Sequence, residues 1–127
     1  MVSVVFLLGF TGESVVSIYG GKTSAIYRGN VNEKRISLMF NVYENTENVN
    51  AIIDILEGYG VHATFFVGGC WADDNEETLK RIVSSGNEMA NHGYFHKDHK
   101  NLSYEGNIKE IKNTNVIVES LSGVAPK

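Results

Sequence analysis

The sequence predicts an α/β fold built from right-handed βαβ units around a parallel sheet. Three observations support this class. Short β-rich apolar runs alternate with segments of helical periodicity, the segments between them are short, and the middle apolar run has almost no polar residue. Strands and helices that alternate at this spacing form parallel sheets, whose strands are covered on both faces. We place this domain at residues 35–127, after an N-terminal arm or β ribbon at residues 1–34.

The N-terminal arm opens with the apolar run MVSVVFLLGF, which is preceded by no Lys or Arg. A membrane span needs roughly twenty apolar residues, so this run is too short to be one. An export signal would carry a basic region ahead of the apolar run. A first strand or packed terminal arm is therefore favoured over the remnant of an export signal. The following residues 12–30 read as two short β pieces broken at Gly20 and Gly21.

The first βα unit begins with RISLMFNV (35–42), a β-rich apolar run of strand length. The next segment, NTENVNAIIDILEGYG, is expected to be helical, with Asn45 or Thr46 as its N-cap and Gly58 or Gly60 as its stop. Its apolar residues recur at helical spacing and predict one buried stripe: Val49, Ile52, Ile53, Ile55 and Leu56.

The second unit begins with VHATFFVGG (61–69), an apolar strand of the kind that is buried on both faces. The segment DDNEETLKRIVSSG (73–86) is expected to be a helix that starts with a capping box from Asp74 to Glu77 and stops at Gly86. Its apolar face is formed by Leu79, Ile82 and Val83.

The third unit pairs a short strand, NEMANH (87–92), with a long helix over 103–123 that Ser103 opens. The expected apolar stripe of this helix comprises Ile108, Ile111, Val116, Ile117 and Leu121. The chain then reaches GVAPK, where a fourth strand should begin. Three strands and a ribbon would leave an open apolar sheet edge. We therefore interpret the chain as the N-terminal part of a longer barrel or sheet, or as one completed by self-association.

Composition excludes some classes of partner. The net charge is −4, and no run of Lys and Arg is longer than a pair such as Lys34 and Arg35, which argues against binding to nucleic acid. Cys70 is the only cysteine, so an intrachain disulfide is impossible, and we expect a buried structural thiol rather than a reactive one.

Parallel α/β sheets gather their chemistry at the carboxyl ends of the strands. The residues whose side chains could bind a ligand or take part in catalysis follow the expected strands at three places: Phe40–Glu44, Val67–Trp71 and Asn91–His96. His92 and His96 are four residues apart and both follow a buried strand. Spacing alone leaves metal ligation and a structural role equally open.

The other histidines and the surrounding pattern narrow the site. His62 at a strand start and His99 in a polar turn are expected to be structural. Gly93 follows His92, which excludes the zincin pattern, where Glu follows the first His. Catalytic zinc usually has three protein ligands. The neighbouring strand end, FNVYEN, offers the Asn41 amide and the Glu44 carboxylate.

These segments together resemble the NodB-type polysaccharide deacetylases, carbohydrate esterase family 4. The similarity runs from about Ala25 onward and is carried by AIYRGNVNEKRISLMF, AIIDILEGYGVHATFFVGG and LKRIVSSGNEMANHGYFHKDHKNLS. The last segment is the most specific, because it contains Asn-His, a variable triplet, a second His and a polar turn that ends in Leu-Ser.

The resemblance implies a distorted (β/α) barrel that removes N- or O-acetyl groups from chitin, peptidoglycan or xylan, outside the cytoplasm or in the cell envelope. It also implies Zn²⁺ or a similar divalent ion held by two histidines and an aspartate. The ion activates water and polarises the acetyl carbonyl, and a second aspartate takes the proton. Carried over by position, His92 and His96 are the metal histidines.

Important positions depart from the family. Its first motif, Thr-Phe-Asp-Asp-Gly, corresponds here to residues 39–43, so Asn41 replaces the base and Val42 replaces the metal-binding aspartate. Gly93 stands where the family has Ser or Thr, and the family's later motifs would lie beyond Lys127. Loss of a general base costs on the order of 10²–10⁴ in rate. Glu44 is a candidate substitute for the missing ligand.

Three interpretations follow from this pattern: a weakened hydrolase of acetylated glycans, a non-catalytic member that binds glycan or metal, and a fragment of a longer enzyme. Aromatic residues near the strand ends are candidates for stacking on sugar rings, or for packing the top of the barrel. They are Tyr43, Trp71, Tyr94 and Phe95.

Overall fold

The computed structural model describes residues 29, 30 and 32–127. The chain divides into two units, Met1–Lys34 and Arg35–Lys127. The expected N-terminal ribbon lies almost entirely outside the described residues. The second unit carries every element discussed below.

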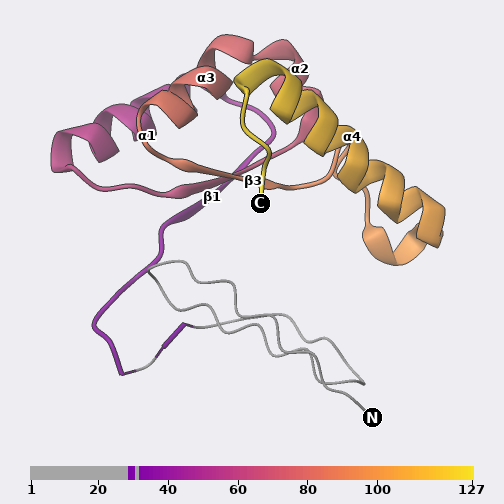
Figure 1. The fold of residues 1–127 in the computed structure, drawn as a ribbon, viewed down its shortest axis with the longest axis horizontal. Helices are drawn as coiled ribbons and strands as arrows, with labels where there is room; N and C mark the ends of the chain where they lie inside the picture. The colour runs from indigo at the N-terminus through magenta and orange to yellow at the C-terminus, as the bar shows by residue number, and fades with distance from the viewer. Residues whose placement is uncertain (1–28, 31) are drawn as a thin grey trace. The chain divides into compact units, whose positions relative to one another are not determined.

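The unit Arg35–Lys127 is an α/β structure in which strands and helices alternate (Figure 1). Its elements in chain order are β1 (Met39–Val42), α1 (Thr46–Tyr59), β2 (Thr64–Val67), α2 (Gly69–Asp74), α3 (Glu76–Ser84), β3 (Glu88–Asn91), the 3-10 turn η1 (His99–Asn101) and α4 (Tyr104–Ser122). The predicted succession of strand and helix is confirmed. None of the helices in the described part of the chain is long and apolar enough to cross a membrane.

The three strands form one parallel sheet in the order β1-β2-β3. The register places Asn41 beside Phe66, and Phe66 beside Ala90. The backbone after α4 returns to the free side of β3, where Lys127 N–H donates to Met89 O at 3.0 Å and Asn91 N–H donates to Lys127 O at 3.2 Å. This is a parallel bridge, and it lies where the sequence predicts a fourth strand.

The helices cover one side of the sheet, and the core lies between them (Figure 1). Alternate strand residues, including Val42, Phe65 and Val67, point into this core. Burial of each such side chain stabilises the fold by about 1.5–3 kcal/mol. The core cluster comprises Val42, Val49, Ile53, Leu56, Ala63, Phe65, Val67, Trp71, Ala72, Leu79, Ile82, Met89 and Val118.

The strands are shorter than the sequence predicts. β1 begins at Met39 rather than at residue 35, and β2 covers Thr64–Val67 rather than 61–69. The apolar runs continue beyond the stretch in which the parallel strands pair, so apolar character overestimates strand length. Gly68 and Gly69 leave the strand and start α2, a helix that the sequence pattern does not reveal.

The predicted capping box at the start of α3 is wrong. Asp74 is the last residue of α2, and Asn75 is the N-cap of α3 without a side-chain cap bond. The Asn75 amide is used elsewhere, because Nδ2 donates to Trp71 O at 2.8 Å and Oδ1 accepts from the Thr46 hydroxyl at 2.6 Å. By contrast, Ser103 caps α4 as expected, and its hydroxyl accepts from Gly106 N–H at 3.1 Å.

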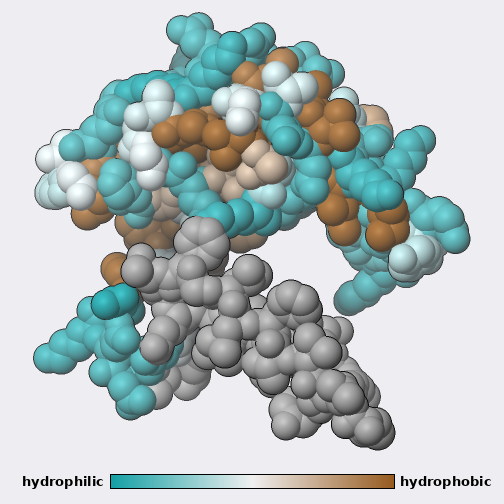
Figure 2. Space-filling model, in the orientation of Figure 1, coloured by the Kyte–Doolittle hydropathy of each residue, from teal (hydrophilic) through white to brown (hydrophobic). Residues whose placement is uncertain are grey.

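The apolar stripes expected on the buried faces of α1 and α4 are partly wrong. In α1, Ile55 is 59% exposed, while Val49, Ile53 and Leu56 are buried. In α4 the buried face is Glu110, Thr114 and Val118, whereas Ile111 and Val116 are exposed. Figure 2 shows apolar surface along this helix. Hydrophobicity alone misplaced the inner face of α4, because polar residues occupy two of its buried positions.

Candidate active site

The carboxyl ends of the three strands meet at one loop, residues 92–96, which we call the histidine loop. It follows β3 and carries His92 and His96. His92 N–H donates to Val67 O at 3.1 Å, so the loop starts beside the end of β2. The start of α2 then holds it, because Gly69 N–H donates to Gly93 O at 3.0 Å and Cys70 N–H donates to Tyr94 O at 3.1 Å.

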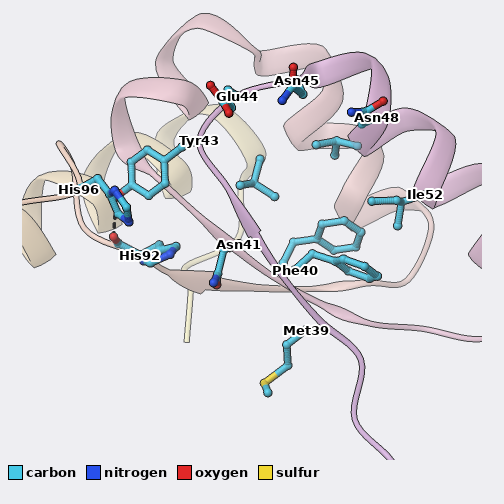
Figure 3. A pocket seen from close by; sticks show the side chains of 13 residues that line it. Met39, Phe40, Asn41, Tyr43, Glu44, Asn45, Asn48, Ile52, His92 and His96 are labelled. Carbon is cyan, nitrogen blue, oxygen red and sulfur yellow. Dashed lines mark hydrogen bonds between the residues drawn. The ribbon is translucent and has the colours of Figure 1, made fainter.

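The two imidazoles of the histidine loop lie against each other. Their ring centres are 5.2 Å apart and their planes are nearly perpendicular, at 89°. Zinc lies about 2.0–2.1 Å from a ligating imidazole nitrogen, so two rings that share one tetrahedral zinc have centres about 5 Å apart. The separation is therefore the one that a shared ion requires. Figure 3 shows both rings beside Tyr43 and Asn41 at one end of β1.

Tyr43, which follows β1, is hydrogen-bonded to the backbone of the histidine loop. Its hydroxyl lies 2.5 Å from His92 O and 2.8 Å from Gly93 O, so a single O–H is shared between two carbonyl groups. Its ring lies 5.1 Å from the His92 ring and 4.5 Å from the His96 ring. Burial raises the pKa of Tyr43 to about 12, so this hydroxyl keeps its proton and acts as a donor near neutral pH.

The electrostatics around His92 favour its neutral form. Burial lowers the pKa of His92 below its ordinary value, and the neighbouring His96 lowers it further. A neutral imidazole offers a lone pair, which is the form that ligates a metal ion. The surroundings of His92 thus favour the neutral ring that can bind a metal ion over the protonated ring that cannot.

A buried carboxylate supports the histidine loop from α4. Glu110 is 5% exposed, and its Oε2 accepts from Tyr94 N–H at 2.9 Å and from Phe95 N–H at 2.7 Å. Asn91 Oδ1 accepts from Gly93 N–H at 2.7 Å. Sequence reasoning missed Glu110. The available signal was its spacing of four residues from Thr114, which places both on one helical face.

Two glycines allow the close approach at this site. A Cβ at Gly68 would lie 2.5 Å from Cδ1 and Cζ of the Tyr43 ring, and one at Gly69 would lie 2.9 Å from Cε2 of Tyr94. Such distances exclude a side chain unless the aromatic rings move. The pair Gly68-Gly69 is therefore required by the site, although the sequence suggested only the end of a strand.

Glu44, the candidate third ligand, does not lie beside the histidine pair. Glu44 is exposed, and Figure 3 shows it apart from His92 and His96. Within the described part of the chain, no three His, Cys, Asp or Glu side chains are grouped so that they could hold a metal ion. Asn41 and Val42 line the same pocket as the two histidines, but Val42 is only 2% exposed and belongs to the core.

The aromatic candidates separate into different environments. Trp71 is 4% exposed, and its indole N–H donates to the Thr46 hydroxyl at 3.1 Å. A ring buried in this way has no face for a sugar, which corrects the expectation that Trp71 stacks on substrate. Phe95 is 58% exposed and lies 4.6 Å from the Tyr94 ring, centre to centre.

The remaining predicted residues lie outside the imidazole pair. His99 Nδ1 is hydrogen-bonded to Asn107 Oδ1, and His62 is exposed beside Gly86. Cys70 is a free thiol that is half-buried rather than fully buried as expected.

The sequence of the chain matches a known protein family. Residues 28–127 match the polysaccharide deacetylase family. This chain belongs to that family. The peptidoglycan-N-acetylmuramic acid deacetylase PdaC of Bacillus subtilis is 40% identical over 95 residues, which cover 75% of the present chain and 20% of PdaC.

Solved structures of this family have the same fold. A carbohydrate esterase family 4 pseudoenzyme from Bacillus anthracis matches with a TM-score of 0.77 and 34% identity over 80% of the present chain and 36% of its own. A mutant of that pseudoenzyme, described as having restored enzymatic activity, matches with a TM-score of 0.77 and 32% identity over 80% and 38% of the two chains. The present chain spans less than half the length of the curated relatives that it matches.

Proposed function

We propose that this chain supplies the metal-binding side of a deacetylase site for acetylated glycans, with weak or absent turnover. One observation carries the proposal. The ring centres of His92 and His96 lie 5.2 Å apart in a pocket that is also lined by Asn41 and Val42, where the family motif has two aspartates. The imidazole pair is thus retained, while the acidic partners are missing.

The donor set fits a divalent ion held by two imidazoles. The ring separation and the low pKa of His92 both favour ligation. An ion held there would polarise an acetyl carbonyl. Two protein ligands bind zinc less firmly than the usual three, so we expect affinity to be low.

The catalytic deficit follows from Asn41. An amide cannot accept a proton near neutral pH, and Val42 offers neither a ligand nor a base. The side chain of Asn41 is exposed to the pocket, so a carboxylate at this position would be solvated and able to act as a base. Val42 lies in the core, where a carboxylate would be costly unless an ion compensated its charge.

The relatives support this interpretation. A pseudoenzyme with the same fold exists, and a mutant of it is described as having regained activity. We infer that this chain retains a scaffold that substitution can reactivate. PdaC acts on peptidoglycan, so we propose an acetylated cell-wall or chitin-like glycan as substrate or ligand, outside the cytoplasm or in the cell envelope. Exposed Phe95 and neighbouring Tyr94 are the proposed sugar contacts.

The test combines metal binding with acetate release. Zn²⁺ binding is measured by equilibrium dialysis for the wild type, His92→Ala and Glu44→Ala. If the imidazole pair forms the site, binding should be lost in His92→Ala and kept in Glu44→Ala. Acetate release from chitooligosaccharide and acetylated xylan should not exceed that of His92→Ala. Clear release by the wild type would overturn the proposed deficit.

A paired variant tests the missing aspartates. Asn41→Asp with Val42→Asp should bind Zn²⁺ more tightly than the wild type. Zn²⁺ should also raise its Tm more, because a ligand that binds only the folded state stabilises it by RT ln(1 + [L]/Kd). Equal Zn²⁺ responses in the two proteins would show that residues 41 and 42 do not face the ion.

A further inference from the structure

We propose that Glu110 is a positioning residue that sets the geometry of the His92–His96 pair. The inference rests on the proposed metal-binding function and extends it to α4, an element outside the strand ends. The hydrogen bonds of its carboxylate go to backbone amides between the two histidines. It acts through the backbone of the histidine loop.

The contacts of Glu110 are specific to the peptide between the two histidines. A single oxygen, Oε2, accepts from Tyr94 N–H at 2.9 Å and from Phe95 N–H at 2.7 Å. These are the short distances of charge-assisted hydrogen bonds. Both donors lie between His92 and His96 in the sequence, so a shift of this carboxylate would move the turn that determines their separation.

The loop needs such support because its backbone is unusual. Gly93 has φ 80°, and His96 has φ 55°, in the left-handed region that non-glycine residues rarely adopt. Glycine adopts a positive φ without strain, but a strained non-glycine residue such as His96 persists only when surrounding contacts hold it. Tyr43 and the start of α2 hold the carbonyl groups of the loop, and Glu110 holds two of its amide groups.

Glu110 is also distinctive in its burial. Among the buried residues of the described part of the chain, it is the one acidic or basic side chain. A buried carboxylate is costly unless hydrogen bonds satisfy it. Here those bonds go to the histidine loop. A solely structural role would be served as well by an apolar residue, as at Val118 on the same face of α4.

The experiment compares Glu110→Ala, Glu110→Gln and Glu119→Ala. Glu119 is exposed on the same helix and provides the matched control. The readouts are Zn²⁺ affinity by titration calorimetry and amide hydrogen exchange of the metal-free proteins by NMR. Residues that orient metal ligands typically change affinity 10–100-fold when mutated.

The expected result is a loss of Zn²⁺ affinity of about 10–100-fold in Glu110→Ala. Glu110→Gln should retain part of it, since its amide oxygen can accept the same two bonds without charge. Glu119→Ala should bind within about twofold of the wild type. Exchange at Tyr94 and Phe95 should accelerate in Glu110→Ala, while core amides such as that of Ile53 remain protected.

Two outcomes overturn the inference. One is unchanged Zn²⁺ affinity in Glu110→Ala. The other is acceleration of exchange at Ile53 to the same degree as at Tyr94 and Phe95, which would mean a general effect on the fold. If the wild type binds no Zn²⁺, the proposed metal function fails separately. The positioning role is then decided by the metal-free exchange rates, which support it only if the change is confined to the loop.

Discussion

Substitution of Gly68 by Ala perturbs the contact between the start of α2 and Tyr43. The backbone of Gly68 is in an ordinary extended conformation, with φ −77° and ψ 138°, so alanine adds no backbone strain. Its Cβ would lie 2.5 Å from two carbons of the Tyr43 ring. The optimum for carbon–carbon contact is about 3.5–4.0 Å, so the ring must move by about 1 Å or more.

The cost follows from what holds that ring. The Tyr43 hydroxyl is bonded to His92 O and Gly93 O at 2.5 Å and 2.8 Å, and a shift of the ring breaks both contacts. Overpacking costs about 1–3 kcal/mol, and each lost hydrogen bond costs about 0.5–1.5 kcal/mol. Since relaxation recovers part of this sum, we expect Gly68→Ala to destabilise the protein by about 2–4 kcal/mol.

The assay is urea denaturation followed by circular dichroism. Gly58→Ala is the matched control, because nothing lies within 4 Å of its added Cβ and it lies in the last turn of α1. We expect that variant to be neutral or up to about 1 kcal/mol more stable. In a double-mutant cycle, Tyr43→Gly should relieve the clash and show a coupling of about 1–3 kcal/mol with Gly68→Ala. A Gly68→Ala protein within about 0.5 kcal/mol of the wild type would refute the reasoning.

Three further predictions concern other elements. Trp71→Ala should lower the free energy of unfolding by about 3–5 kcal/mol. Trp71→Phe keeps most of the side-chain volume and should leave co-sedimentation with glycan unchanged. Weaker glycan binding by Trp71→Phe would contradict the assignment of Trp71 to the core. Arg81 joins α3 to two carboxylates of α1, so Arg81→Met should lower the denaturation midpoint slightly at low salt and less at 1 M NaCl, measured by denaturation in both buffers. Hydrogen bonds from Lys127 and then Thr64 lower the pKa of Glu88. Its stabilising effect is therefore present above the unfolded-state pKa and is lost as the pH falls through the lower folded-state pKa. Glu88→Gln should therefore flatten the acid limb of a stability curve, at pH values below the ordinary glutamate pKa of 4.5.

Much of the architecture follows from periodicity. The alternation of strands and helices, the parallel sheet and the convergence of three strand ends could be predicted, because apolar runs and helical stripes reflect burial directly. The residues at which the strands begin and end could not be predicted in this way. Residues 35–38 are as β-like as the strand that follows, yet β1 starts at Met39. Strand length depends on where a partner strand lies, and a single chain segment does not contain that information.

The site was predictable to the extent that its residues are chemically distinctive. His92 and His96 are recognisable by residue type and position, whereas Glu110 resembles an ordinary helical glutamate. Its partners are backbone amides 15 and 16 residues away, which no side-chain motif records. Trp71 was misassigned for the opposite reason. An aromatic residue at a strand end suits both a sugar platform and a core, and only its burial distinguishes the two.

The histidine loop explains why the imidazole pair can persist without the acidic partners. Tyr43, Glu110 and the start of α2 satisfy the carbonyl and amide groups of the loop with protein hydrogen bonds. The separation of His92 and His96 therefore does not depend on a third ligand to hold it. On the proposed function, Asn41 and Val42 in place of two aspartates remove a base and a metal contact, while the hydrogen bonds of the loop leave the rings in place. We therefore propose that the geometry of the imidazole pair and catalytic competence are separable in this fold, with α2 and α4 maintaining the first and residues 41 and 42 deciding the second.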